Sequence, residues 1–305
     1  MHQPVLLTEV MNYLITDPEG IYLDGTLGGG GHTRELAQKL SQKGHIYALD
    51  RDQEVLQKTL LNLDQSRITA IHTDFSKMQA VLAAQGINQV TGILLDLGVS
   101  SFQLDEQERG FSFHIDAPLD MRMDRSQMLN AQIIVNSWSE AEIAQILKDY
   151  GEERYARAIA RAIVKSRLIK PIDSTLDLVE LIKSAVPAAY RREKHPARRT
   201  FQGLRIAVNR ELEALKASLP QAVELLQPGG RLCIITFHSL EDRIVKQFFV
   251  EQARTCICPP DFPICVCGVK PILRLVKRKG IEPSDQEIAE NPRARSAKLR
   301  IAEKI

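Results

Sequence analysis

The residues best suited to chemistry lie in one short segment, LDGTLGGGGH, at residues 23–32. An acid, Asp24, precedes a run of four glycines that opens a helical pattern, a position where backbone N–H groups and the helix dipole favour an anion. A dinucleotide fingerprint requires Gly-x-Gly-x-x-Gly, but Thr33 stands where the third glycine would follow Gly28 and Gly30. The lysine of a P-loop is also missing, so both phosphate-binding interpretations are weakened.

Acids at the ends of successive predicted strands favour a different ligand. Asp24 would repel a phosphate but attract an ammonium group, whose neighbouring carboxylate would bind the helix amides. Asp50 ends the second strand, where a carboxylate accepts hydrogen bonds from ribose hydroxyls. Asp74 and Phe75 end the third strand and suit the amino edge and the face of an adenine. Together these features describe S-adenosylmethionine; a turn that needs glycines only for packing is the alternative.

Four of the five cysteines lie within twelve residues, as Cys256-x-Cys258 and Cys265-x-Cys267. This bunching differs from a disulfide framework spread over a secreted fold. Two thiolate pairs across a proline-rich turn could surround one structural zinc ion tetrahedrally, although the usual spacing is Cys-x-x-Cys. Free or partly buried thiols are the alternative, and nothing in the sequence suggests a catalytic metal.

Charge is distributed unevenly along the chain. Residues 96–150 contain ten acids and four Lys or Arg, whereas residues 151–210 contain fourteen Lys or Arg and six acids. Such a separation favours a polyanion on one side of the molecule, and two solvated helix faces are the alternative.

The stretch YRREKHPARRTFQGLR, at residues 190–205, concentrates this positive charge. It carries six Lys or Arg and one Glu, with Tyr190 and Phe201 interleaved. Arginines with aromatic residues suit RNA phosphates and stacked bases, so we expect Arg198 and Arg199 to hold phosphates of an RNA substrate. A solvated connection between helices is the alternative.

Strand and helix patterns alternate in the first hundred residues and predict a parallel sheet with helices on both faces. The strands are expected at 21–26, 45–50, 68–75 and 92–98, and the helices at 31–42, 52–63 and 76–85. Ligands of such sheets bind beyond the carboxyl ends of the strands, where the glycine segment and the acids stand.

The alternation stops after residue 98 and returns only near the C-terminus. Residues 99–126 are typical of a loop, and three helices follow at 137–151, 152–167 and 174–186, the first with a Ser139–Glu142 capping box and the last ended by Pro187. An amphipathic stretch at 203–226 leads to strands at 229–239, 272–279 and 296–304. We therefore expect one α/β domain, residues 1–109 and 206–305, and an inserted helical domain for RNA recognition, residues 110–205.

Composition agrees with a soluble protein. Hydrophobic residues make up 44% of the 305 residues and charged ones 26%, and no apolar stretch approaches the ~20 residues of a membrane-spanning helix. The first residues lack a basic leader and a cleavage site, so we expect a cytoplasmic location and no membrane partner.

Long strings spread over the chain resemble one known family. They run from residue 2 to about residue 302 and include YLDGTLGGGGHT, LLDLGVSSFQLD, HPARRTFQ and ENPRARSAKLR. In this order they look like the RsmH (MraW) family of bacterial 16S ribosomal RNA cytosine-N4 methyltransferases. The resemblance implies a class I, Rossmann-like methyltransferase fold: a doubly wound, mostly parallel α/β sheet with an all-helical insertion.

The resemblance also implies the reaction and its partners. S-adenosyl-L-methionine would methylate the exocyclic amine of a decoding-centre cytidine in 16S rRNA of the small ribosomal subunit. Cofactor contacts are implied at Gly30, Gly31, His32, Asp50, Phe75, Asp96 and Gln103. The glycine segment, Asp50 and Phe75 follow from the residues as well, and the oligomeric state stays open.

An exocyclic cytosine amine is a poor nucleophile because its lone pair is delocalised into the ring. Acceptors aimed at its hydrogens, with in-line placement opposite the sulfonium methyl, would localise that lone pair. Many amine methyltransferases place an Asp or Asn, two prolines and an aromatic after the fourth strand, whereas this chain has Asp96 followed by LGVSS. Asp96 is the catalytic candidate by position, unless it contacts only the cofactor.

Other residues near the active edge have two interpretations each. Phe102, Phe111 and Phe113 would stack on an extruded base or pack the core of the insertion. After the fifth strand, His238 and Glu241 offer a proton acceptor, and Ser239 offers a helix cap.

Two rival functions belong to other classes. A nucleotide-dependent oxidoreductase would bind NAD, which the Asp24 and Thr33 pattern opposes. A non-catalytic ribosome-assembly factor would keep the cofactor fold as a relic, which the intact strand-end acids oppose.

Overall fold

The computed structural model describes residues 4–193, 195–259, 264 and 266–305, and it divides the chain into two compact units. The α/β unit contains Met1–Gly98 and Glu213–Ile305, and the helical unit contains Val99–Leu212. The helical unit is longer at both ends than the predicted 110–205. Val99 and Leu104 pack on its core, and Asn209 donates to Met121 O at 2.7 Å, so the flanking segments belong to it.

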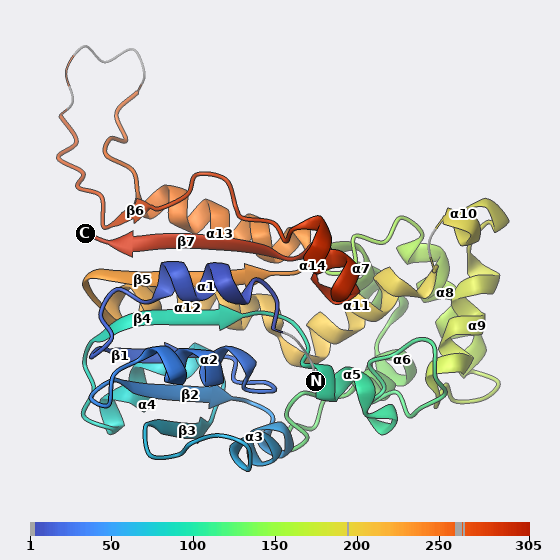
Figure 1. The fold of residues 1–305 in the computed structure, drawn as a ribbon. Coiled ribbons are helices and arrows are strands. Elements are labelled where there is room, and N and C mark those ends of the chain that lie inside the picture. The colour runs from blue at the N-terminus through green and yellow to red at the C-terminus, as the bar shows by residue number, and fades with distance from the viewer. Residues whose placement is uncertain (1–3, 194, 260–263, 265) are drawn as a thin grey trace. The chain divides into compact units, whose positions relative to one another are not determined.

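A seven-stranded sheet with the order β3-β2-β1-β4-β5-β7-β6 forms the α/β unit (Figure 1). Strands β1 to β5 run parallel, whereas β7 is antiparallel to both β5 and β6. The strands are β1 (Ile21–Asp24), β2 (His45–Asp50), β3 (Ile68–His72), β4 (Val90–Asp96), β5 (Leu226–Thr236), β6 (Leu273–Leu275) and β7 (Lys298–Lys304). This topology confirms the predicted class I methyltransferase fold.

Helices cover both faces of the sheet because buried side chains alternate along the strands. Tyr22 and Leu94 face one hydrophobic cluster, while Leu23 and Ile93 face the other. The first cluster includes side chains of α1 (Leu7–Leu14), α2 (Gly31–Lys39) and α3 (Gln53–Leu60); the second includes those of α4 (Met78–Ala84), α12 (Glu211–Leu225) and α13 (Ser239–Gln252). Figure 1 shows α1 and α2 in front of the strands. The unit also contains η1 (Phe75–Lys77), α14 (Asp285–Glu290) and η3 (Pro292–Ser296).

Some predicted elements have different bounds. The amphipathic stretch 203–226 is not one helix, because Arg210 adopts a left-handed conformation with φ of 51° and separates α11 from α12. The strand expected at 272–279 is limited to the three residues of β6, and the strand expected at 229–239 starts and ends three residues earlier, as β5.

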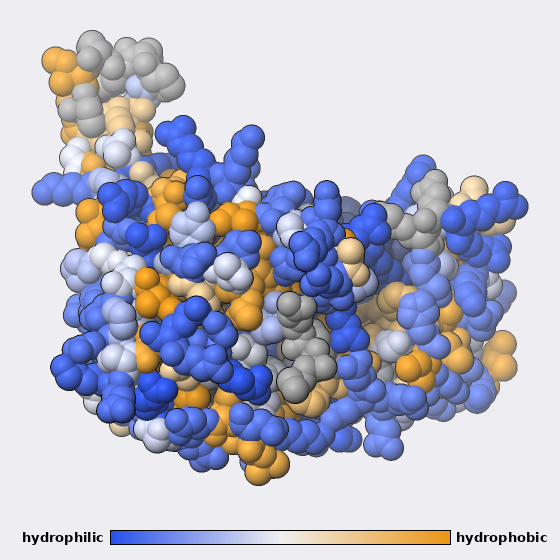
Figure 2. Space-filling view, in the orientation of Figure 1, coloured by the Kyte–Doolittle hydropathy of each residue, from blue (hydrophilic) through white to orange (hydrophobic). Residues whose placement is uncertain are grey.

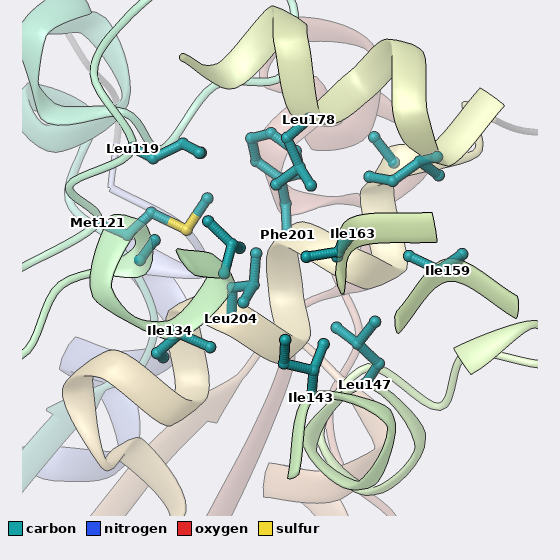
Figure 3. Packing of buried hydrophobic residues seen from close by; sticks show 14 of the residues in the cluster. Leu119, Met121, Ile134, Ile143, Leu147, Ile159, Ile163, Leu178, Phe201 and Leu204 are labelled. Carbon is teal, nitrogen blue, oxygen red and sulfur yellow. The ribbon is translucent and has the colours of Figure 1, made fainter. Parts of the chain in front are cut away.

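The helical unit is built around a single apolar cluster, shown in Figure 3. Its elements are α5 (Ser101–Asp105), η2 (Gln107–Arg109), α6 (Ala131–Ser137), α7 (Glu140–Asp149), α8 (Ala156–Arg167), α9 (Thr175–Ala185), α10 (Ala188–Glu193) and α11 (Ala197–Asn209). Ile143 and Leu147 of α7, Ile159 and Ile163 of α8 and Phe201 of α11 point into this cluster (Figure 3).

The predicted helix starts of this unit are partly confirmed and partly wrong. The predicted Ser139–Glu142 capping box is present, since Glu142 N donates to Ser139 Oγ and Ser139 N donates to Glu142 Oε2. The expected loop at 99–126 is wrong in its first part, where a second capping box, on Ser100, begins α5. The helix expected from residue 152 begins only at Ala156.

Candidate active site

Three aspartates end neighbouring strands at one edge of the sheet. Asp24 is the last residue of β1, Asp50 of β2 and Asp96 of β4. Because β1 pairs in parallel with both β2 and β4, the three carboxyl ends meet at the same edge. The glycine loop, residues 25–31, follows β1 directly and lies at this edge with them.

The glycine loop needs glycine for conformation and for space. Gly28 and Gly30 have φ of 48° and 70°, and a Cβ on Gly30 would stand 2.6 Å from Thr59 Cγ2. Gly28 N donates to Asp50 Oδ2 at 2.8 Å, and Thr59 Oγ1 donates to Gly28 O at 2.6 Å. The loop is therefore clamped between the end of β2 and α3.

Helix α2 begins in close contact with the N-terminal segment. A Cβ on Gly31 would stand 2.3 Å from Pro4 Cγ. His32 is buried, with Nε2 3.0 Å from Val5 O and Nδ1 3.6 Å from Asp96 Oδ2. Because a ring nitrogen that faces a carbonyl must carry the hydrogen, Nε2 donates to Val5 and the other nitrogen faces the Asp96 carboxyl group.

Asp24 is 1% exposed and binds the loop's own groups. Its Oδ2 accepts from Thr33 Oγ1 at 2.6 Å and its Oδ1 accepts from Thr26 N at 3.0 Å. Burial raises the pKa of this carboxyl group, while the Thr33 hydrogen bond and the nearby His32 lower it. Because Asp24 is almost fully buried, it holds the loop from within, and its predicted contact with an ammonium group stays a prediction.

Asp50 shapes the loop and keeps acceptor capacity. Its Oδ2 accepts from Gly28 N and its Oδ1 accepts from Asp52 N at 2.8 Å. Burial raises the pKa of Asp50 to about 6, although both hydrogen bonds lower it. Each carboxylate oxygen has a second lone pair, so Asp50 is able to accept from two further hydroxyl groups.

Asp96 contains a buried polar atom that no described residue binds. Its backbone N donates to Thr26 Oγ1 at 2.6 Å, which holds the end of β4 against the glycine loop. Its Oδ1 is buried and has no hydrogen-bond partner among the described residues. Burial raises the pKa of Asp96 well above the usual range, and the charges of Asp24 and Glu241 raise it further. An unpaired buried acceptor costs about 1–3 kcal/mol, so this atom indicates where an N–H donor would bind.

Phe75 lies beside the start of the glycine loop. Its Cβ is 3.2 Å from the position that a Cβ on Gly25 would take, and its side chain is half-buried. The neighbouring Asp74 caps η1 by accepting from Ser76 N at 2.8 Å and pairs with Arg51 Nη1 at 3.3 Å. The structure therefore places Phe75 beside the glycine loop, where its contact with an adenine stays a prediction, while Asp74 has structural partners.

The start of α13 is capped by His238, and the expected Ser239 cap is wrong. Glu241 N donates to His238 Nδ1 at 3.4 Å, and Glu241 Oε2 accepts from Phe237 N at 2.8 Å. His238 Nε2 lies 3.2 Å from Glu241 Oε1. His238 Nε2 is nevertheless buried without a hydrogen-bond partner among the described residues, so His238 and Asp96 both stay predicted proton acceptors at this edge of the sheet.

Gln103 and Phe102 belong to the helical unit, on α5. Gln103 is 4% exposed and its Oε1 accepts from Ser100 N at 3.0 Å, which completes a capping box. This contact holds the first turn of α5, and the predicted contact of Gln103 with a cofactor stays a prediction. Phe102 is 39% exposed and is free to stack on a ligand.

The other two phenylalanines of this region differ from Phe102. Phe111 is buried in the core of the helical unit, with Arg109 6.0 Å above its ring. Phe113 is stacked on His195 at 4.5 Å and meets Phe201 edge-on at 5.6 Å. Phe111 therefore packs the core of the helical unit, which was one of its two interpretations.

Arg198 and Arg199 are exposed on the first turn of α11. Arg199 Nη1 donates to Glu152 O at 2.9 Å, which places it beside the segment that leads into α8. An open depression of about 620 Å³ is lined by Lys148 and residues 152–158. Its lining combines three cations, Lys148, Arg154 and Arg157, with Tyr155 and two acids, Glu152 and Glu153.

Sequence reasoning missed a row of cations along α8. Arg157, Arg161 and Lys165 are all exposed and recur every four residues, and Arg154 is exposed just before the helix begins. This spacing places the first three on one face, opposite the buried Ile159. The signal was present in the sequence, because the apolar face of this helix was recognised and its opposite face follows from the same period. We call Arg157, Arg161 and Lys165 the α8 cationic row.

The described part of the cysteine motif forms a cluster. The Sγ atoms of Cys256, Cys258 and Cys267 all lie within 4.8 Å of one another, and Cys265 lies outside the described residues. The fifth cysteine, Cys233, is buried in β5, and burial raises the pKa of its thiol to about 12.

Comparisons with known proteins cover the whole chain. The family model described as "MraW methylase family" matches residues 1–305. A protein of Heliobacterium modesticaldum named "Ribosomal RNA small subunit methyltransferase H" is 54% identical over 308 residues, covering 100% of this chain and 98% of its own. Proteins of the same name from Halothermothrix orenii and Symbiobacterium thermophilum are each 51% identical, covering 100% of this chain and 98% and 96% of their own lengths. Among the described residues, every helix is too short or too polar to cross a membrane.

Proposed function

The chain belongs to the MraW methylase family, and from that premise we propose that it is an S-adenosylmethionine-dependent methyltransferase of small-subunit ribosomal RNA. The proposed product is N4-methylcytidine at one position in the decoding centre of 16S rRNA, within the small ribosomal subunit. The proposed site of action is the cytoplasm. The names of the relatives support rRNA of the small subunit as substrate, and the unpaired Asp96 Oδ1 supports an amine as the acceptor group.

The cofactor would lie at the carboxyl edge of the sheet. S-adenosylmethionine supplies, when bound, a methyl group on a positively charged sulfur. We assign the two ribose hydroxyls to the remaining lone pairs of Asp50 and the adenine face to the half-buried ring of Phe75. The backbone of Gly30, Gly31 and His32 would bind the methionine portion at the start of α2. Gln103 of the helical unit is a further predicted contact.

Asp96 is the residue that we propose to activate the amine. Its Oδ1 would accept a hydrogen bond from N4, which draws the nitrogen toward tetrahedral geometry and exposes its lone pair to the methyl group. The N4–CH3 bond forms as the S–CH3 bond breaks, and the electron pair of that bond remains on sulfur. N4 then carries a positive charge and loses one proton.

The raised pKa of Asp96 suits it to take that proton. Burial and the neighbouring acids make its ionised form more basic than an ordinary carboxylate. His32 Nδ1 lies 3.6 Å from Asp96 Oδ2, the oxygen that does not face the amine in this arrangement. The chemistry needs no metal ion, so the cysteine motif has no part in it.

The helical unit would hold the RNA. Arg198, Arg199 and the α8 cationic row offer charges for phosphates, and Phe102 offers an exposed ring for a base. None of these residues carries sequence information by itself, so they would position the RNA rather than select the target.

The reaction is tested with methyl-labelled cofactor and small subunits from a strain that lacks this protein. We expect one label per subunit, mapped by mass spectrometry to N4 of a single 16S rRNA cytidine. Naked 16S rRNA and mature subunits from the parent strain are the controls for substrate form and for prior methylation. Label on carbon, on adenine or on protein would refute the proposal.

A further inference from the structure

The segment between α13 and β6 is irregular wherever the structure describes it. Its described residues, within 253–272, contain no helix or strand. The two ends meet, because Ile272 N donates to Gln252 O at 2.9 Å. Figure 1 shows the described parts of the segment standing away from the sheet, beyond α13 and β6.

The large apolar side chains among the described residues of this segment are not packed in a core. Ile257, Ile264 and Val266 are 62%, 73% and 72% exposed, and Figure 2 shows apolar surface on the segment. Ordering one residue of backbone costs about 1–2 kcal/mol, and these side chains bury too little surface to compensate. Small folds without a core are commonly held by disulfides or by a metal ion.

The thiols of the segment are spaced for a metal ion. The Sγ atoms of Cys256, Cys258 and Cys267 lie within 4.8 Å of one another, and those of Cys256 and Cys267 are 3.9 Å apart. A tetrahedral zinc ion with Zn–S bonds of about 2.3 Å requires sulfurs about 3.8 Å apart. A disulfide requires about 2.05 Å, so the observed separation matches ligands of one shared ion.

Backbone N–H groups point at the same three sulfurs. Ile257 N donates to Cys267 Sγ at 3.4 Å, Cys258 N to Cys256 Sγ at 3.3 Å and Val266 N to Cys258 Sγ at 3.4 Å. Each described thiol of the motif thus accepts one backbone hydrogen bond. Such donors stabilise a thiolate, the form of cysteine that binds metals.

We propose that Cys256, Cys258 and Cys267, with one further ligand, bind a structural zinc ion that holds the segment between α13 and β6. Cys265 completes the motif in the sequence and lies outside the described residues. Thiolates select soft or borderline metals, and Zn²⁺ accepts a tetrahedral set without a redox change. The proposal is independent of methyl transfer, because no ligand belongs to the proposed active site.

Metal analysis of the purified full-length protein tests the proposal, with Cys233→Ser as the matched control. We expect about one zinc per chain in the wild type and in Cys233→Ser after dialysis against a weak chelator, and at least about a tenfold loss in Cys256→Ser and Cys267→Ser. Equal zinc content in the wild type and the Cys256→Ser/Cys258→Ser/Cys267→Ser triple variant would overturn the proposal. So would a disulfide among these cysteines, found by mass spectrometry after purification under reducing conditions.

Two further measurements remain decisive if the variants fold poorly. X-ray absorption of the wild-type protein should give Zn–S distances near 2.3 Å with at least three sulfur ligands, and a zinc shell of nitrogen and oxygen alone would refute the site. Trypsin cleavage after the exposed Arg254 should accelerate when zinc is removed, while cleavage elsewhere in the chain stays unchanged. Identical cleavage rates at Arg254 with and without zinc would contradict a role in holding the segment.

Discussion

In the α/β unit the acids of the proposed site are buried or half-buried, whereas the cations of the helical unit that we propose to hold RNA are exposed. Asp24 and Asp50 hold the glycine loop through short hydrogen bonds, and Asp96 Oδ1 stands buried without a partner among the described residues. The α8 cationic row and Arg198 instead lie on the surface of their helices. The acids of the α/β unit therefore depend on exact placement, whereas the cations of the helical unit depend on their combined charge.

This difference predicts how each unit responds to substitution. A buried group that positions a loop or a nucleophile has no neighbour that can replace it. A single substitution there should therefore lower kcat or cofactor affinity strongly at all salt concentrations. Exposed cations act together through phosphate neutralisation, so single changes should be modest and salt should modulate them. Experiments on both units therefore test the comparison directly.

The largest effect is expected from Asp96→Asn. The amide still accepts a hydrogen bond from an amine but no longer takes a proton, so kcat should fall at least about 100-fold. Affinity for S-adenosylhomocysteine, measured by calorimetry, should change by only a few-fold. Asp64→Asn, which removes an exposed carboxylate of the same unit, should leave both values unchanged. A loss of cofactor affinity as large as the loss of rate would make Asp96 a cofactor ligand instead.

The next largest effect is expected from Gly30→Ala. The added Cβ would meet Thr59 Cγ2 at 2.6 Å in a left-handed backbone, which should cost about 2–4 kcal/mol of stability and at least tenfold in cofactor affinity. Gly86→Ala is a matched control, because Gly86 has φ of 75° but nothing within 4 Å of its Cβ position. Chemical denaturation and calorimetry of both variants separate strain from the clash. Equal costs in the two would show that the packing around Gly30 does not matter.

A smaller effect is expected from Arg157→Ala/Arg161→Ala/Lys165→Ala. Loss of three phosphate contacts should reduce RNA affinity about tenfold and lower the slope of log K against log salt by about 2. A control triple, Lys39→Ala/Lys43→Ala/Lys58→Ala, removes the same charge from exposed positions of the α/β unit and should change neither quantity. If both triples lower the slope equally, RNA affinity follows net charge, and the contrast between the two units fails.

Local sequence signals predicted where the three aspartates of the α/β unit lie, because strand ends are easy to recognise. An acid after an apolar run, as at Asp50 and Asp96, must lie at the carboxyl edge of a parallel sheet. The partners of these acids were not predictable. The hydrogen bond from Thr33 Oγ1 to Asp24 depends on how α2 packs. Histidine is an uncommon helix cap, so Ser239 was predicted as the cap in place of His238.

The helical unit was harder to predict because its features depend on long-range packing. The break at Arg210 places a non-glycine residue in a left-handed conformation, which its type does not favour. Asn209, just before it, is buried and donates to Met121 O, and that contact is invisible in the local sequence. The α8 cationic row, in contrast, follows from helical period alone and was available from the start.

The smallest effect expected is the pH dependence of cofactor binding through Asp50. Its pKa of about 6 lies above the value of about 3.8 expected in the unfolded chain, so the folded protein binds this proton more tightly. The contribution of Asp50 to stability is therefore full below about pH 4 and is lost as the pH rises through about 6. Cofactor affinity should move the opposite way, because the ionised carboxylate accepts from both ribose hydroxyls.

We expect affinity for S-adenosylhomocysteine to rise a few-fold between about pH 5 and pH 7 in the wild type, and to stay flat in Asp50→Asn. Calorimetry of both proteins across this range isolates the contribution of Asp50 to the pH dependence of affinity, because Asp24, Asp96 and His32 are common to both. A parallel pH profile in the two proteins would assign the titration to another buried group. In that case Asp50 would hold the loop through Gly28 and Asp52 without contacting the ribose, and the geometry of the α/β unit would serve structure more than recognition.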